Sequence, residues 1–125
     1  MIMRNLIVYI LYLSIAFTSC TSIKKINPNT SALIHTKWKY VDTDWQYEIE
    51  FKKNGQLLTT HPNDHSIGND TWVQSDKQIN FYYNDKFAIY KGKLVTEDTI
   101  KGSGMNKKGS WEFTMYKLKS GSKNP

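Results

Sequence analysis

The stretch QYEIEFKKNG, residues Gln46–Gly55, decides the fold that we expect for this chain. Its apolar residues Tyr47, Ile49 and Phe51 alternate with polar ones, and a period of two places them together on one face of a β-strand. The polar triplet Lys53-Asn54-Gly55 then predicts a tight turn, because Asn and Gly tolerate the backbone angles that turns require. The chain should return over residues 56–60 as a second, antiparallel strand.

Similar short apolar runs, bounded by turn residues, recur toward the C-terminal end. Turn signals spaced about 8–12 residues apart are typical of a sandwich or a barrel, and short hairpin links favour pairing between neighbours in sequence. We therefore predict an all-β domain of about eight short antiparallel strands in an up-and-down meander. It should be a closed or nearly closed small barrel, because closure removes exposed strand edges.

The predicted domain spans residues 33–118, between a flexible tether at residues 20–32 and a flexible tail at residues 119–125. A barrel of this size is just wide enough to be filled by side chains or to hold one small ligand. The inward set is bulky, so we expect a filled interior with at most a shallow pocket at one mouth. The residues predicted to fill it are Trp38, Tyr40, Tyr47, Ile49, Phe51, Ile79, Phe81, Trp111 and Phe113.

The first 19 residues differ from the rest and predict a secretory signal peptide. Arg4 is followed by an uncharged apolar run at residues 5–17, and Thr18 and Ser19 precede Cys20. The run is shorter than the roughly 20 residues that a membrane-spanning helix needs. Cys20 is the only cysteine, so an intramolecular disulfide is impossible.

The segment Phe17-Thr18-Ser19-Cys20 resembles the lipobox of bacterial lipoproteins. The resemblance implies cleavage before Cys20 and lipidation of its thiol with fatty-acyl chains such as palmitate. Two such chains suffice for stable anchoring. The protein would then sit in the cell envelope, on the outer membrane facing the periplasm if the cell is Gram-negative. Two alternatives are an uncleaved membrane anchor and a cleaved signal followed by an ordinary free cysteine.

A second resemblance covers most of residues 34–118. The segments at 36–40, 48–55, 68–72, 79–81 and 109–113, of which TKWKY and EIEFKKNG are the first two, together resemble small bacterial lipocalin-like domains. The family usually has Gly where Thr36 stands. The resemblance implies a barrel in a lipoprotein context and implies no catalytic residues.

The best cluster for a site is His61-Pro62-Asn63-Asp64-His65, in a long loop over residues 60–70. His61, Asp64 and His65 are candidate contacts for a ligand or partner. Histidines four apart share a face only in a helix, and Pro62 indicates a loop, so we expect no metal here. We expect no cofactor and no enzyme activity, because the chain has no Gly-x-Ser-x-Gly motif and lipid would occupy Cys20.

The formal charge of the chain bears on the kinds of partner that it can bind. Removing residues 1–19 takes away Arg4 and no acid, so the formal charge falls from +6 to +5. Export argues against a nucleic-acid partner. The lysines are expected to be solvated, with attraction to anionic lipid head groups or an acidic partner as an alternative.

Two functions follow as hypotheses, with a small hydrolase a distant third. The first is a non-enzymatic lipoprotein that binds a small apolar or amphipathic ligand at the barrel mouth. The second is a protein-interaction lipoprotein (an inhibitor, an immunity-type protein or an envelope subunit) that uses its loops and outer sheet face. Under the second, Tyr82, Tyr90 and Tyr116 are expected to point outward.

Overall fold

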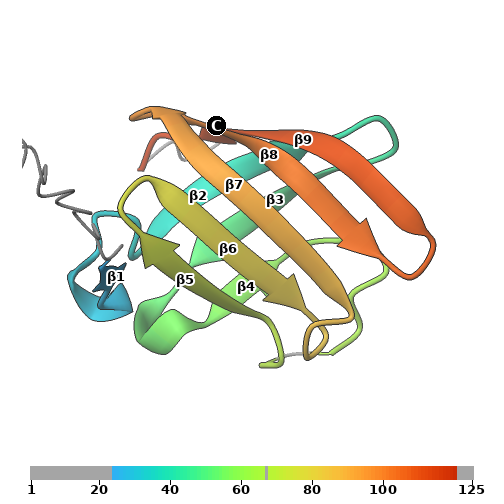
Figure 1. Cartoon of the computed structure of the whole chain (residues 1–125), viewed down its shortest axis with the longest axis horizontal. Helices are drawn as coiled ribbons and strands as arrows, with labels where there is room; N and C mark the ends of the chain where they lie inside the picture. The colour runs from blue at the N-terminus through green and yellow to red at the C-terminus, as the bar shows by residue number, and fades with distance from the viewer. Residues whose placement is uncertain (1–23, 67, 121–125) are drawn as a thin grey trace, which may run out of the picture.

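The computed structural model describes residues 24–66 and 68–120. The predicted signal peptide, the predicted lipidation site Cys20 and the last five residues of the predicted tail lie outside these ranges. Within them the chain forms one antiparallel sheet that is strongly curled and open (Figure 1). The strands are β1 (Lys25–Ile26), β2 (Thr36–Val41), β3 (Gln46–Phe51), β4 (Leu57–Thr59), β5 (Thr71–Ser75), β6 (Gln78–Tyr83), β7 (Ala88–Thr96), β8 (Thr99–Asn106) and β9 (Gly109–Lys117).

The all-β antiparallel meander is confirmed, with nine strands in place of about eight. The sheet order is β1-β5-β6-β7-β8-β9-β2-β3-β4. The short β1 is additional, and β7 is a long strand of nine residues. Its register with β8 shifts between Leu94 and Thr96.

The sheet opens in the middle of the chain. β2 pairs with β9, with Trp38 opposite Lys117, so the two ends of the domain are joined. The free edges are β4 and the β5 side of the sheet, and the gap between them is the seam. It is crossed by the bridge between Gln56 and Thr71 and by the hydrogen bond from the Leu57 N–H to the Asp70 carbonyl at 3.0 Å. In sequence, the long loop over residues 60–70 connects these two edges.

Part of the predicted tether belongs to the fold. β1 pairs with β5, and the 3-10 turn η1 (Pro28–Thr30) follows it. The Asn29 amide donates to Oδ1 of Asn54 at 3.0 Å, in the second 3-10 turn, η2 (Lys53–Gly55). Ser31 is buried and donates to the side chain of Gln74 on β5. These polar contacts cover the seam, which is why a stretch without apolar periodicity is nevertheless ordered here.

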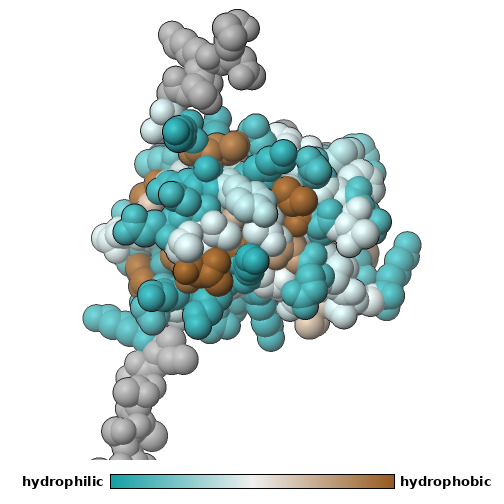
Figure 2. All heavy atoms as spheres, turned by 90° about the horizontal axis from the view of Figure 1, so that it is seen from above, coloured by the Kyte–Doolittle hydropathy of each residue, from teal (hydrophilic) through white to brown (hydrophobic). Residues whose placement is uncertain are grey.

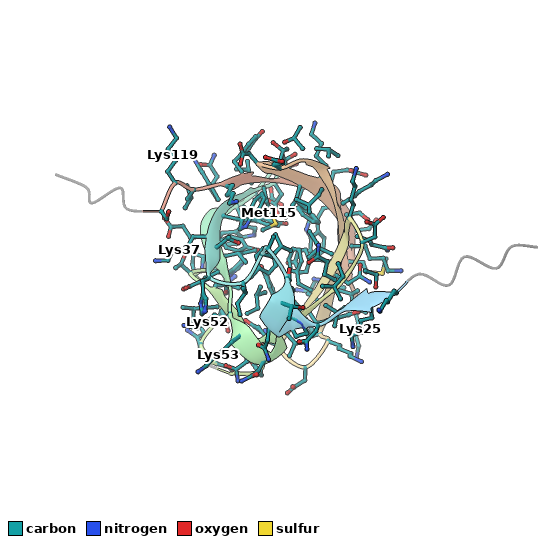
Figure 3. All side chains as sticks on the ribbon, turned by 90° about the vertical axis from the view of Figure 1, so that its left-hand side faces the viewer. Lys25, Lys37, Lys52, Lys53, Met115 and Lys119 are labelled. Atoms are coloured by element: carbon teal, nitrogen blue, oxygen red, sulfur yellow. The ribbon has the colours of Figure 1, made fainter. Side chains whose placement is uncertain are left out.

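The concave face of the sheet holds one aromatic core. The ring of Phe81 on β6 packs edge-on against two others, Phe51 on β3 and Phe113 on β9. Phe81 lies parallel to Tyr90 with ring centroids 4.6 Å apart. Viewed along the curl, side chains fill the interior, Met115 points inward, and Lys25, Lys37, Lys52, Lys53 and Lys119 project outward (Figure 3).

Of the nine predicted interior residues, eight are buried: Trp38, Tyr40, Tyr47, Ile49, Phe51, Ile79, Phe81 and Phe113. Trp111 is only half-buried. The expectation that Tyr90 points outward was wrong, since this side chain is 4% exposed. Residues Phe87 to Tyr90 are all apolar, so no alternation of polar and apolar residues indicates which of these side chains point inward. The side chain of Tyr116 is 50% exposed, and that of Tyr82 is half-buried.

Close approach between β7 and β8 depends on glycine. Gly92 lies opposite Gly102 in the register. A Cβ added to Gly102 would overlap the carbonyl oxygen of Lys91 and lie 2.7 Å from Cα of Gly92. Because both obstacles are backbone atoms, they cannot move aside as a flexible side chain would.

We therefore expect Gly102→Ala to lower the free energy of unfolding by about 2 kcal/mol or more, the cost of overpacking. Urea unfolding followed by circular dichroism measures it. The matched control is Ser103→Ala on the same strand, which should change stability by less than about 0.5 kcal/mol. Equal stabilities of the two variants would contradict the close packing of β7 on β8.

Candidate functional site

A cavity of about 540 Å³ opens at the end of the sheet where the β2–β3, β6–β7 and β8–β9 turns and the 60–70 loop gather. This end, the mouth, lies on the right in Figure 1, and β1 and η1 lie at the other end. Cavities of this size are in the range that holds small organic ligands. The lining residues are Asp42, Asp44, Trp45, Tyr47, His61, Asn63, Asp64, Tyr83, Asn84, Phe87, Ala88, Tyr90, Asn106, Lys108, Gly109, Ser110 and Trp111.

The floor of the mouth is aromatic with polar tips. Tyr47 and Tyr83 share a hydrogen bond between their hydroxyl oxygens at 2.8 Å. Burial is the main cause that raises the pKa of both hydroxyls, with the neighbouring tyrosines adding to it. Burial likewise raises the pKa of Tyr90 to about 12. These hydroxyls therefore stay neutral and offer polar but uncharged contacts at the base of the cavity.

A hydrogen-bond chain fixes one wall. The indole Nε1 of Trp111 donates to the Tyr40 hydroxyl at 2.9 Å, and that hydroxyl donates to Oδ2 of Asp42 at 2.7 Å. The other oxygen of Asp42 accepts the backbone N–H groups of Asp44 at 2.8 Å and Trp45 at 2.7 Å. Asp42 thus orders the β2–β3 turn and sets the position of Trp45 at the rim.

Two large aromatic side chains stand at the rim with much of their surface in solvent. Trp45 is 38% exposed and Phe87 is 55% exposed. Exposing aromatic surface costs free energy, roughly 25 cal/mol per Å². On the outer surface seen in Figure 2, by contrast, hydrophobic side chains form separate spots among hydrophilic ones. Rim aromatics beside a cavity are suited to contact a ligand that enters it.

Two of the three loop residues predicted as a site line the mouth. His61 is half-buried between the rings of Trp45 and Tyr47, with centroids 4.7 and 4.8 Å away. Burial lowers the pKa of His61, with Asp64 and Asp42 acting in the opposite direction. Asp64 also lines the cavity, whereas His65 is exposed and is not part of the lining.

His61 and Asp64 are fixed by local hydrogen bonds. Nδ1 of His61 accepts the backbone N–H of Asn63 at 2.9 Å, which leaves Nε2 to carry the proton of the neutral ring. Asp64 accepts the Thr59 hydroxyl at 3.0 Å and the backbone N–H of Ser66 at 3.2 Å. In the described part of the chain, no three His, Cys, Asp or Glu side chains come together as a metal site would require.

Asp70 supports the β6–β7 turn beside the mouth, and the sequence did not single it out. It is 3% exposed, and its Oδ1 accepts the backbone N–H of Asn84 at 2.8 Å. Asn84, Asp85 and Lys86 all have positive φ, a conformation that side chains seldom adopt in succession. The carboxylate of Asp70 and the carbonyl of Asn69, which accepts the Asp85 N–H at 3.1 Å, hold this turn in place.

Burial raises the pKa of Asp70 to about 6, and Asp64 raises it further while the Asn84 N–H opposes the shift. Because the pKa of Asp70 is higher in the folded chain than in the unfolded chain, folding favours the protonated form of this carboxyl. The contribution of Asp70 to stability is thus fully present below about pH 4, the unfolded pKa, and is lost as the pH rises through 6.

We therefore expect Asp70→Asn to be more stable than the native chain at pH 7.5 and to lose that advantage by pH 4. Asparagine keeps an acceptor for the Asn84 N–H and cannot ionise. Urea unfolding at pH 4, 5, 6 and 7.5 measures the difference. Asp98→Asn, at the exposed β7–β8 turn, is the control and should show no such trend. An advantage that grows toward low pH would contradict the assignment.

A second cavity, of about 1120 Å³, lies on the outer surface beside β1, at the end away from the mouth. It is strongly basic. In register across the strands, Lys25 lies opposite Ser75, and Gln78, Lys93 and Lys101 continue the same row. Lys24, Lys77 and Lys91 complete its six lysines, against the single carboxylate of Asp76.

Comparison of the chain with family models, with curated proteins and with solved structures finds no match. The residues that the structure describes contain no helix that is both long and apolar enough to cross a membrane.

Proposed function

We propose that this protein is a non-enzymatic, lipid-anchored binding protein with a small lipocalin-like barrel, which takes an amphipathic small molecule at its mouth. The mouth cavity carries the proposal: it joins an aromatic floor and two exposed rim aromatics with nine polar or charged lining residues in one space of about 540 Å³. Aromatic side chains supply contact area in ligand pockets, and polar groups placed beside them fix the orientation of the ligand.

The filled interior limits the ligand. Trp38, Tyr40, Phe51 and Phe81 are all buried and occupy the centre of the curl. A long acyl chain would need a deep cavity, and the described residues leave room only at the mouth. The proposed ligand is therefore compact, with an apolar body against Tyr47, Tyr90 and Trp111 and a polar part toward the turns.

The anchor and the basic surface support one orientation. Lys24 follows four residues after Cys20, at the end of the sheet opposite the mouth. Lipid on Cys20 would hold this end at the membrane, and the six lysines of the outer cavity would face anionic head groups there. In this arrangement the mouth opens away from the membrane, toward the compartment from which a ligand arrives.

The tryptophans provide a test of ligand binding with internal controls. Trp45 and Trp111 line the mouth, whereas the indole N–H groups of Trp38 and Trp72 bond to Thr36 and to the Lys52 carbonyl at the other end. We expect water-soluble aromatic amphiphiles such as benzyl alcohol to shift the indole N–H resonances of Trp45 and Trp111 only. The measurement uses the full chain in dodecyl maltoside and heteronuclear NMR.

Trp45→Ala and Phe87→Ala should each weaken this binding several-fold, because a stacked or edge contact contributes about 0.5–1.5 kcal/mol. Leu58→Ala is the matched control, since Leu58 is 41% exposed on β4 and is not part of the mouth lining. Shifts at all four indoles, or at none, would overturn the binding proposal.

The anchor is tested separately. We expect mass spectrometry of the protein from bacterial membranes to find Cys20 as the first residue, carrying diacylglycerol. Cys20→Ser should abolish both the lipid and the cleavage before residue 20, while a Ser22→Ala control leaves them intact. An unmodified Cys20 thiol in the mature protein would refute lipid anchoring and would leave the mouth proposal standing.

A further inference from the structure

The charge at the mouth is opposite to that of the chain. The sequence carries a formal charge of +6. Yet the described residues that line the mouth include the carboxylates of Asp42, Asp44 and Asp64 and one lysine, Lys108. The mouth is thus a local acidic site in a basic protein, and the basic residues gather instead at the other end.

His61 does not offset these carboxylates. Its ring lies between Trp45 and Tyr47 and is half-buried. Burial lowers the pKa of His61, so the imidazole is neutral at pH 7 and above. The tyrosine hydroxyls of the floor are neutral as well, so the carboxylates set the sign of the potential inside the mouth.

The faces of the aromatic rings add a second attraction for cations. Trp45 and Phe87 stand at the rim, and Tyr47, Tyr90 and Trp111 form the floor and wall. The face of an aromatic ring carries negative electrostatic potential and attracts cations, and groups of such rings form cages that bind quaternary ammonium ligands. An anionic ligand would meet three carboxylates and would find only Lys108 as a counter-charge.

We infer that the mouth binds organic cations, with an ammonium group attracted into the cavity by the carboxylates of Asp42, Asp44 and Asp64 that line it, and the apolar part of the molecule against the aromatic rings. The inference rests on the proposed function, since it specifies the ligand class of the same site. It also explains why the rim aromatics are tolerated in solvent next to acidic side chains.

Asp44 is the residue on which to test this inference. It is exposed, and its carboxylate takes no part in the hydrogen bonds that order the β2–β3 turn, which are made by Asp42. Asp44→Asn therefore removes one charge from the mouth and leaves the turn intact. Lys108→Ala removes the one opposing charge, and Glu112→Gln, on the outer face of β9, is the matched control outside the mouth.

The experiment compares three probes with one aromatic body: benzyltrimethylammonium, benzyl alcohol and benzenesulfonate. Each is titrated into the full chain in dodecyl maltoside, and the indole N–H resonances of Trp45 and Trp111 report binding. We expect the cation to bind about tenfold more tightly than the neutral alcohol, as the range of cation–π and charge attraction indicates. The sulfonate should bind most weakly.

Asp44→Asn should lower the affinity for the cation about threefold and leave the alcohol unchanged. Lys108→Ala should raise the affinity for the cation, and Glu112→Gln should do neither. Added salt should weaken binding of the cation and not of the alcohol, because mobile ions screen exposed charges.

The outcomes distinguish a failure of the proposed function from a failure of the ligand class. If none of the probes shifts the mouth indoles, both the proposed function and the ligand class fail. If the alcohol or the sulfonate binds as tightly as the cation, the mouth is a binding site but the assignment to cations is overturned. Equal effects of Asp44→Asn on cation and alcohol would also overturn it.

Discussion

The contact on which this structure depends most is the stack of Tyr90 on Phe81, 4.6 Å apart and nearly parallel, in the middle of the concave face. The ring of Tyr90 also meets Tyr40 on β2 and Phe113 on β9, two strands that lie beyond β8 in the sheet order. Because the sheet is open, ladder hydrogen bonds alone do not hold its curl. Aromatic packing across the interior draws the β5–β7 half onto the β9–β3 half.

The same ring joins the core to the mouth. Tyr90 packs edge-on against Trp111 and lies 4.6 Å from Tyr83, and all three line the cavity. Core and site therefore share side chains, and the floor of the mouth is part of the packed core. A preformed floor binds a compact ligand without the cost of ordering loops. The seam of the sheet lies beside this floor, where Asp70 and the 60–70 loop cover it.

Alternation in the sequence was enough to predict the all-β meander and most of the core, because Tyr47, Ile49 and Phe51 lie on one strand with a clear period. The prediction failed at Tyr90, because Phe87 to Tyr90 include no polar residue that would indicate which side chains point outward. It also missed the place where the sheet opens. Closure at β2–β9 and the gap at β4–β5 depend on non-local pairing, which leaves no local signal. The loop containing His61 and Asp64 could be placed near a mouth, whereas the acidic turn at Asp42 and the role of Asp70 became visible only with the fold.

The division of charge is between two cavities. The cavity at the mouth is lined by Asp42, Asp44 and Asp64, and the outer cavity at the other end is lined by six lysines, among them Lys25, Lys93 and Lys101. A meander alternates its turns between two ends, so the β2–β3 turn with Asp42 and Asp44 lies at the same end as the β6–β7 turn, although the two are far apart in sequence. The chain's net positive charge therefore does not describe the site. With lipid at the basic end, the field of the protein would favour contact with an anionic membrane there and attract cations to the mouth at the other end. Under the proposed function, one simple topology would supply both the surface that faces the membrane and the site that faces the ligand.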